Sequence, residues 1–252
     1  MEHSVVTAPL FFVSADQLAA ATQGSLIVLD GPEGRHGAIV RRIGVGERIV
    51  LTDGIGHRVA AVVESAGAGT LSLRLEAIAY EPQPNSRFVL IQALAKGDRD
   101  EQAIEAATEL GIDEVVPWQA ARSIVIWRGE RAARSLRKWE SVVLAATKQS
   151  RRTRLPLVSA PVSQAAVIQR IERAALSVVL HEEAMLPLAG LELPPSGDVL
   201  LIVGPEGGIS PDELSAFVAA GAVAVRLGHS VLRSSSAGPA ALAVMSAAGR
   251  WR

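Results

Sequence analysis

The sequence predicts an α/β protein in which a small β-barrel precedes a parallel sheet with helices on both faces. Residues 1–80 contain short apolar or alternating segments separated by turn residues, and such a series is typical of a barrel or sandwich. After residue 85, strands and helices alternate along the chain, which is typical of a parallel sheet covered on both sides. The chain has 252 residues, of which 49% are hydrophobic, so it can form two compact domains.

The expected barrel strands are short, and each ends near glycine, proline or aspartate. They cover residues 25–29, 48–52, 58–64 and 70–77. The turns between them contain Asp30-Gly31-Pro32, Asp53-Gly54 and Gly67-Ala68-Gly69. The stretch from Tyr80 to Asn85 carries two prolines among polar residues, so we place the domain boundary there. Residues 1–80 then form the first domain and residues 81–252 the second.

The second domain begins with Phe88–Ala95, a nearly continuous apolar run that is typical of a strand buried on both faces. Further strands are expected over residues 112–118, 176–181, 199–203 and 222–227. Helices are expected over residues 100–110, 131–150, 211–220 and 236–249. The third of these helices has the clearest start, because Ser210 can cap it, Pro211 suits its first position and Glu213 completes a capping box.

The composition excludes several classes of site. There is no cysteine, which excludes disulfides, thiolate metal ligands and cysteine nucleophiles, and the five histidines are too scattered to suggest a metal site. The N-terminus has neither the basic start nor the apolar core of a signal peptide. No run approaches the roughly 18 apolar residues that a membrane-spanning helix needs. We therefore expect a cytoplasmic protein with no membrane partner.

Basic residues are concentrated in one part of the chain, although the net charge of the whole protein is −1. Between Arg122 and Arg154 there are ten arginines and lysines against two glutamates, which gives a local net charge of +8. Such a concentration suits a polyphosphate partner, because each contacted phosphate releases condensed counterions. A solvated helix face is the alternative explanation of the same pattern.

Three loops follow predicted strands and carry the residue types of a binding site. The first is Gly204–Ser210, whose glycines would let a ligand approach the backbone at the carboxyl end of a strand. Its spacing matches neither a G-x-G-x-x-G loop nor a Walker loop, and a tight structural turn is the alternative. The second loop is Leu227–Gly238, in which the serines could instead cap the last helix. The third is Leu180–Glu183, whose two carboxylates could simply be solvated.

In their order and spacing, these three loops resemble the S-adenosylmethionine site of SPOUT methyltransferases, and the chain is similar to the 16S rRNA uridine-N3 methyltransferase family. The supporting motifs extend over roughly residues 29–248. They are His36–Gly54 with its Asp-Gly turn, Lys96–Arg99 followed by Ala106–Gly111, and Lys138-Trp139 followed by Ala145-Ala146, Gln149-Ser150-Arg151 and Leu155-Pro156. The chain departs from the family at Ser234-Ser235-Ser236, where the family often has Thr-Glu-Thr, so no role of that glutamate is transferred.

The resemblance implies a PUA-like barrel that orients RNA, followed by a SPOUT domain whose C-terminal chain threads through a loop as a trefoil knot. It implies S-adenosylmethionine as the cofactor, no metal, and 16S rRNA of the small ribosomal subunit as the partner. The reaction would be methylation of N3 of one specific uridine. It also implies a homodimer formed through the knotted domain, in which the terminal helix either contributes to the interface or is simply buried in its own core.

The resemblance, the chemistry of the reaction and the charge pattern together suggest the site residues. The cofactor would contact Leu180, His181, Glu182, Gly204, Pro205, Glu206, Gly207, Gly208, Leu227, Gly228, Val231, Leu232, Arg233 and Ser234. As catalytic residues, Arg233 would stabilise negative charge on the uridine and Glu206 would accept a proton or orient the base. A site that works mainly by aligning the two reactants is the alternative. The RNA would contact Arg122, Arg128, Arg131, Arg134, Lys138, Lys148, Arg151, Arg152 and Arg154.

Two other functions compete with this one. Another SPOUT enzyme could act on tRNA or on a ribose 2′-hydroxyl, although the barrel-first order and the motif within Lys96–Gly111 favour uridine-N3 methylation. A non-catalytic RNA-binding or assembly factor could retain the same fold. Failure to bind S-adenosylmethionine would identify the latter.

Overall fold

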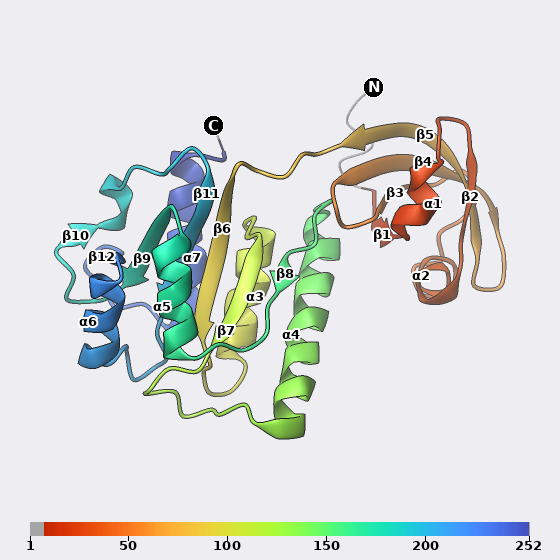
Figure 1. The fold of residues 1–252 in the computed structure, drawn as a ribbon. Helices are drawn as coiled ribbons and strands as arrows, with labels where there is room; N and C mark the ends of the chain where they lie inside the picture. Colours follow the sequence, from red (N-terminus) through yellow and green to blue (C-terminus); the bar gives the residue numbers. More distant parts are fainter. Residues whose placement is uncertain (1–7, 252) are drawn as a thin grey trace. The chain divides into compact units, whose positions relative to one another are not determined.

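The computed structural model describes residues 8–251, which form two compact units (Figure 1). The first unit consists of residues 8–83 together with Thr147–Leu155, and the second consists of Pro84–Ala146 together with residues 156–251. Within residues 8–251, no helix has both the length and the apolar character required to cross a membrane.

The first unit is built on a curled five-stranded sheet with the strand order β1-β3-β4-β5-β2. Its strands are β1 (Leu10–Phe12), β2 (Leu26–Leu29), β3 (Arg48–Thr52), β4 (His57–Ala66) and β5 (Leu71–Tyr80). Only β1 and β3 pair in parallel, and the other pairs are antiparallel. Alternate residues of each strand face one core, so Leu71, Leu73 and Leu75 are all buried. The small barrel-like unit predicted from this alternation is confirmed, and β1 is an additional strand.

Three short helical segments complete the first unit. They are α1 (Ala15–Ala19), α2 (Gly31–Arg35) and the π-helix η1 (His36–Val40). Each has only five residues, which is too few for a helical period to show in the sequence.

The segment Thr147–Leu155, which includes the last residues of helix α4, packs within the first unit. The Thr52 hydroxyl donates to the Thr153 carbonyl over 2.9 Å. The Arg154 guanidinium donates from Nε and Nη2 to the Glu81 carbonyl over 3.0 and 2.7 Å. Arg154 therefore has a structural role inside this unit.

The second unit is built on a seven-stranded parallel sheet with the order β10-β12-β9-β11-β6-β7-β8. Its strands are β6 (Ser86–Ala93), β7 (Glu114–Trp118), β8 (Leu157–Val158), β9 (Leu176–Leu180), β10 (Leu186–Pro187), β11 (Gly197–Val203) and β12 (Val223–Arg226). Its helices are α3 (Arg99–Glu109), α4 (Gly129–Ser150), α5 (Gln164–Arg173), α6 (Pro211–Ala219), α7 (Ser234–Ala248) and the 3-10 helix η2 (Leu188–Gly190). The predicted parallel sheet and the capping box of Ser210 and Glu213 are confirmed.

Two helices of the second unit differ from the prediction. Helix α5 was not predicted, because its buried face consists only of Val167 and Ile171. The last helix begins at Ser234 rather than Ser236, since the Arg233 carbonyl already accepts hydrogen bonds from the N–H groups of Ser236 and Ala237.

The sheet separates two apolar layers, because successive residues of each strand point to opposite faces. On one face, Leu90 of β6 packs in a cluster with residues of α3, α4 and α7. On the other face, Val89 and Ile91 pack in a cluster with residues of α5 and α6. Figure 1 shows these two helices on the same side of the sheet. Helix α7 lies very close to the sheet, since a Cβ on Gly238 would be only 3.1 Å from Leu90 Cδ1.

The connection between β9 and β11 lies beside the C-terminal part of the second unit. Strands β9 and β11 are neighbours, but the connection between them runs outside β12, because β10 pairs with the outer edge of that strand. The same connection also contacts α7, through η2. These contacts place the connection beside both β12 and α7, while the trefoil knot itself, which is rare in proteins, stays a prediction.

Arg250 fastens the chain after α7 to the sheet. Its guanidinium donates to the carbonyls of Gly111 and Ser86 over 2.6 and 2.7 Å, and it pairs with the Asp113 carboxylate. The same group lies 4.0 Å from the centre of the Phe88 ring.

We expect Arg250→Ala to lower the free energy of unfolding of the second unit by about 2 kcal/mol, because two carbonyls and a carboxylate lose a charged donor. Urea unfolding followed by circular dichroism measures the change. Arg137→Ala is the matched control, because Arg137 is exposed on α4 and should change stability by less than about 0.5 kcal/mol. Equal effects of the two replacements would contradict a fastening role for Arg250.

Candidate functional site

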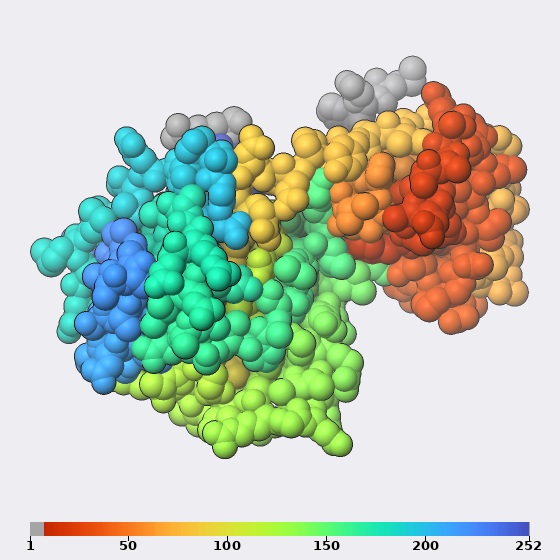
Figure 2. Space-filling model, in the orientation of Figure 1, coloured from red at the N-terminus to blue at the C-terminus, as the bar shows by residue number. Residues whose placement is uncertain are grey.

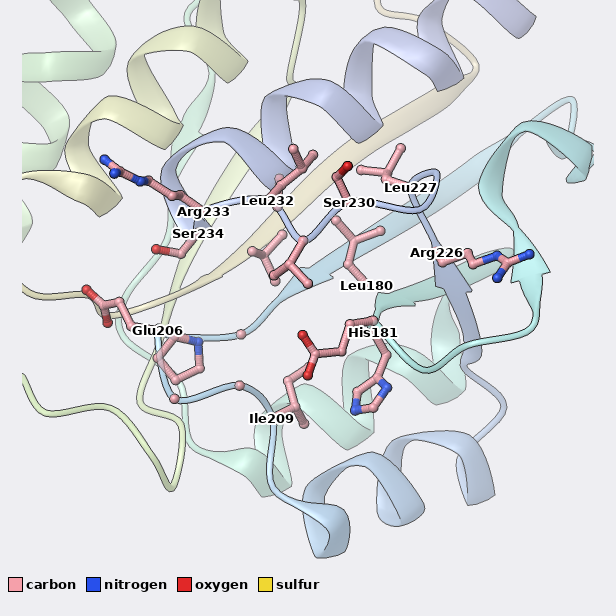
Figure 3. Close-up of a pocket in the computed structure, with 18 of the residues that line it drawn as sticks. Leu180, His181, Glu206, Ile209, Arg226, Leu227, Ser230, Leu232, Arg233 and Ser234 are labelled. Atoms are coloured by element: carbon pink, nitrogen blue, oxygen red, sulfur yellow. The ribbon is translucent and has the colours of Figure 1, made fainter.

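The candidate site lies at the carboxyl edge of the parallel sheet. Strands β9, β11 and β12 are close together in this sheet, so the loops that follow them leave it at the same edge. These loops line a pocket of about 530 Å³, and Figure 3 shows side chains from all three gathered around one space. Every residue predicted to contact the cofactor lines this pocket. Ligands of open parallel sheets bind at this edge.

The loop after β11 has a backbone that requires glycine. A Cβ on Gly204 would lie 2.7 Å from Ile209 Cγ1, and Gly208 has a φ of +72°. The Gly208 N–H donates to the Pro205 carbonyl over 2.9 Å, which closes a turn. The loop therefore keeps its backbone, rather than bulky side chains, against the pocket.

Ser234, the first residue of α7, provides the clearest sign of a ligand. It lines the pocket and is only 8% exposed, yet its hydroxyl has no hydrogen-bond partner among residues 8–251. Buried polar atoms nearly always have a partner. Leu180, Leu227 and Leu232 add apolar surface, and the volume lies within the range of small-molecule sites. The pocket thus suits a ligand with both polar and apolar parts.

Two arginines from other segments also line the pocket. Arg99 begins α3, and Arg122 precedes α4. The Arg122 Nη1 donates to the Gly207 carbonyl over 3.0 Å, and a Cβ on Gly207 would lie 3.3 Å from the Arg122 Cβ. The sequence suggested Arg122 as an RNA contact and gave no site role to Arg99. The position of Arg99 directly after a strand and turn was the available signal.

Glu206 is held by two partners. Its Oε1 accepts hydrogen bonds from the Lys96 N–H and from Arg99 Nη1, each over 2.9 Å. Burial acts to raise the pKa of Glu206, but hydrogen bonds from its own N–H, from the Lys96 N–H and from Arg99 outweigh burial and lower the pKa. A carboxylate with a lowered pKa is a poor proton acceptor at neutral pH. This geometry favours an orienting role for Glu206.

Arg233 differs from Glu206, which is held by two partners. It is exposed, and its guanidinium forms no hydrogen bond or ion pair with the part of the chain that the structure describes. Figure 3 shows Arg233 and Arg226 at opposite ends of the pocket. The Arg233 guanidinium can therefore contact a second ligand at the rim.

Other residues that the sequence did not single out also line the pocket. They are Val203, Ile209, Arg226, His229, Ser230 and Ala237. All lie within or beside the three predicted loops. Among residues 8–251 there is no cluster of three or more histidine, aspartate or glutamate side chains that could hold a metal ion.

Apart from Arg122, which lines the pocket, the predicted RNA contacts fall into two groups. Arg128, Arg131, Arg134 and Lys138 are exposed on the second unit, where Figure 2 shows residues 119–130 and the start of α4 in light green at the surface. Lys148, Arg151, Arg152 and Arg154 are half-buried in the first unit and make contacts there. The first group is the better candidate for phosphates, because its side chains are accessible.

Comparisons with known proteins agree with this architecture. The sequence matches the RNA methyltransferase domain family over residues 81–246 and the RNA methyltransferase PUA domain family over residues 29–76. A ribosomal RNA small subunit methyltransferase E from Mycobacterium bovis is 46% identical over 233 residues, which cover 90% of this chain and 89% of that protein.

Two solved structures have the same fold. A ribosomal RNA small subunit methyltransferase E from Neisseria gonorrhoeae, bound to S-adenosyl methionine, is 26% identical with a TM-score of 0.82, covering 95% of this chain and 97% of that one. A methyltransferase from Legionella pneumophila, in complex with the same cofactor, is 26% identical with a TM-score of 0.81, covering 96% and 98%. Together with the family matches, these relatives show that the chain belongs to the RNA methyltransferase family that includes ribosomal RNA small subunit methyltransferase E.

Proposed function

We propose that this protein uses S-adenosylmethionine to methylate N3 of uridine 1498, in the usual rRNA numbering, in 16S rRNA of the small ribosomal subunit. The observation that supports this most is the pocket formed by the loops after β9, β11 and β12. The partnerless Ser234 hydroxyl and the cofactor-bound relative from Neisseria gonorrhoeae support the same ligand. This substrate would place the activity in the cytoplasm. The proposal involves no metal ion.

Some residues of this chain would hold the cofactor, and others would contact the uridine. When bound, S-adenosylmethionine supplies an electrophilic methyl group. Leu180–Glu182, Gly204–Gly208 and Leu227–Ser234 hold its adenosyl part with backbone groups and apolar side chains. Arg233 contacts the uridine and stabilises the negative charge that the base carries once N3 has lost its proton to solvent water.

Glu206 would act as a positioning residue for Arg99. If the two act as one unit, Arg99→Ala and Glu206→Gln should each lower kcat about 10-fold, and the double variant should lower it no further. Steady-state kinetics of the three variants measure this coupling. If the kcat of the double variant falls by the product of the two single losses, the proposed coupling is contradicted. A proton-accepting Glu206 would instead show as an acidic limb of the wild-type pH profile that Glu206→Gln removes.

The exposed arginines of the second unit would contact RNA phosphates. We expect the triple replacement of Arg128, Arg131 and Arg134 by alanine to weaken RNA binding and to reduce the slope of log affinity against log salt by about 2. Filter binding at several salt concentrations measures the slope. Arg173→Ala, an exposed arginine on α5, is the control and should leave the slope unchanged. An unchanged slope in the triple variant would refute the phosphate role.

A homodimer formed through the second unit is part of the proposal. Most of the apolar face of α7 is already buried in its own chain, including Gly238, Leu242 and Met245. Half-buried Ala240, Ala243 and Val244 remain for an interface. Sedimentation equilibrium should give twice the monomer mass of 26.4 kDa.

Mass mapping of the RNA product tests the proposed function. Small subunits from a strain that lacks the modification are incubated with the protein and S-adenosylmethionine, and the nucleosides are then analysed. We expect 3-methyluridine at one position of 16S rRNA. A methylated ribose or a methylated tRNA would support another SPOUT reaction. Absence of cofactor binding would support a non-catalytic factor.

A further inference from the structure

A second cavity lies between the start of α3 and helix α4 in the second unit. Its volume is about 320 Å³. Lys96 and Asp100 line one side, and Trp127, Arg131 and Lys138 line the other. Arg131 and Lys138 are seven residues apart on α4 and therefore share one face of that helix.

The cavity adjoins the pocket described above. Two chain segments line both the cavity and the pocket. The turn between β6 and α3 places Lys96 in the cavity and Arg99 in the pocket. The segment before α4 places Trp127 in the cavity and Arg122 in the pocket. The Lys96 N–H and Arg99 Nη1 share the same Glu206 oxygen, so this wall is common to both spaces. A polymeric ligand that places one of its units in the pocket can therefore place the neighbouring unit in the cavity.

Trp127 gives the cavity an aromatic surface. Its ring makes a T-shaped contact with the buried Trp139, with centroids 5.4 Å apart and an interplanar angle of 80°. This contact fixes the ring, while the side chain stays half-buried and lines the cavity. Unpaired RNA bases stack on aromatic side chains held in this way.

Of the charged side chains that line the cavity around Trp127, some are paired with another side chain and others are not. Lys138 pairs with Glu101 over 2.6 Å. Lys96 and Arg131 have no side-chain partner among residues 8–251, and both can contact a phosphate. Asp100 is buried, and its Oδ1 accepts from the Glu101 N–H over 2.9 Å. A carboxylate repels phosphate but accepts hydrogen bonds from the N–H groups of a base.

We propose that this cavity binds one unstacked nucleotide of the RNA substrate, with the base on Trp127 near Asp100 and the phosphate at Lys96 and Arg131. The inference rests on the proposed function, because it takes the adjoining pocket as the place where RNA is modified. It adds a base-stacking site to a surface that would otherwise bind RNA only through phosphates. The volume suits one nucleotide rather than a longer segment.

The test uses the full chain and a fluorescein-labelled ten-residue oligouridylate. Trp127→Ala should weaken binding of this oligonucleotide about 10-fold, and Trp127→Phe should stay within about 3-fold of the wild type because it keeps an aromatic face. Trp251→Ala is the matched control, since Trp251 is 57% exposed and lies outside the cavity. The double variant Lys96→Ala and Arg131→Ala should also weaken binding and reduce its salt dependence.

Calorimetry with S-adenosylmethionine separates the two proposals. Unchanged cofactor affinity in Trp127→Ala shows that the variant is folded, and failure of the wild type to bind the cofactor would count against the proposed function alone. Should Trp127→Ala fail to fold, Trp127→Phe and the double variant decide the outcome. Oligouridylate binding that is unaffected in Trp127→Ala, or weakened tenfold in Trp127→Phe, would overturn the stacking site. Equal affinities for uridine monophosphate and the oligonucleotide would identify a free-nucleotide site and overturn the RNA assignment.

Discussion

Replacement of Arg233 by alanine should lower kcat by about 100- to 1,000-fold while changing S-adenosylmethionine affinity by less than about 5-fold. The reason is that Arg233 lies exposed at the rim of the pocket without a protein partner, where its guanidinium can stabilise charge on the uridine. Single-turnover methylation of small subunits measures the rate, and calorimetry measures the affinity.

Arg233→Lys provides the control. It keeps the positive charge but loses the planar pair of donors, so its rate should fall between those of the wild type and the alanine variant. If Arg233→Ala weakens S-adenosylmethionine binding but leaves kcat unchanged, Arg233 contacts the cofactor rather than the uridine. An unchanged rate in Arg233→Ala would favour a site that works by alignment alone.

Replacement of Ala237 by tryptophan should weaken S-adenosylmethionine binding by at least about 100-fold. Ala237 lies in the first turns of α7 and lines the pocket, so an indole there would occupy space that the adenosyl part needs. Isothermal titration calorimetry measures the affinity, and thermal unfolding shows whether the variant is folded.

Ala248→Trp is the matched control on the same helix. Ala248 is exposed at the end of α7 and does not line the pocket, so this variant should bind the cofactor as the wild type does. Wild-type affinity in a folded Ala237→Trp variant would mean that the cofactor binds elsewhere.

The sequence predicted the fold well where side chains alternate or strands are wholly buried. The buried run of β6 and the alternation of β4 and β5 each reflect one strand and the faces it presents, so they can be read locally. The two-residue strands β8 and β10 are too short to carry such a pattern. The packing of Thr147–Leu155 within the first unit depends on distant partners, as in the contact between Thr52 and Thr153.

The position of the candidate site was predictable, but several roles within it were not. Parallel strands share a carboxyl edge, so the loops after β9, β11 and β12 were expected at the same edge, and the resemblance grouped them into one site. The partners of Glu206 are 110 and 107 residues away, and no local pattern indicates that Lys96 and Arg99 hold it. The same limit applies to Arg154, a predicted RNA contact that bonds to Glu81 across 73 residues.

Hydrogen–deuterium exchange with and without S-adenosylmethionine tests the placement of the cofactor most directly. We expect slower exchange in peptides that contain residues 180–182, 204–208 and 227–234, together with unchanged exchange throughout the first unit. Binding of the cofactor with no protection of these three segments, or with protection only in the first unit, would contradict the account.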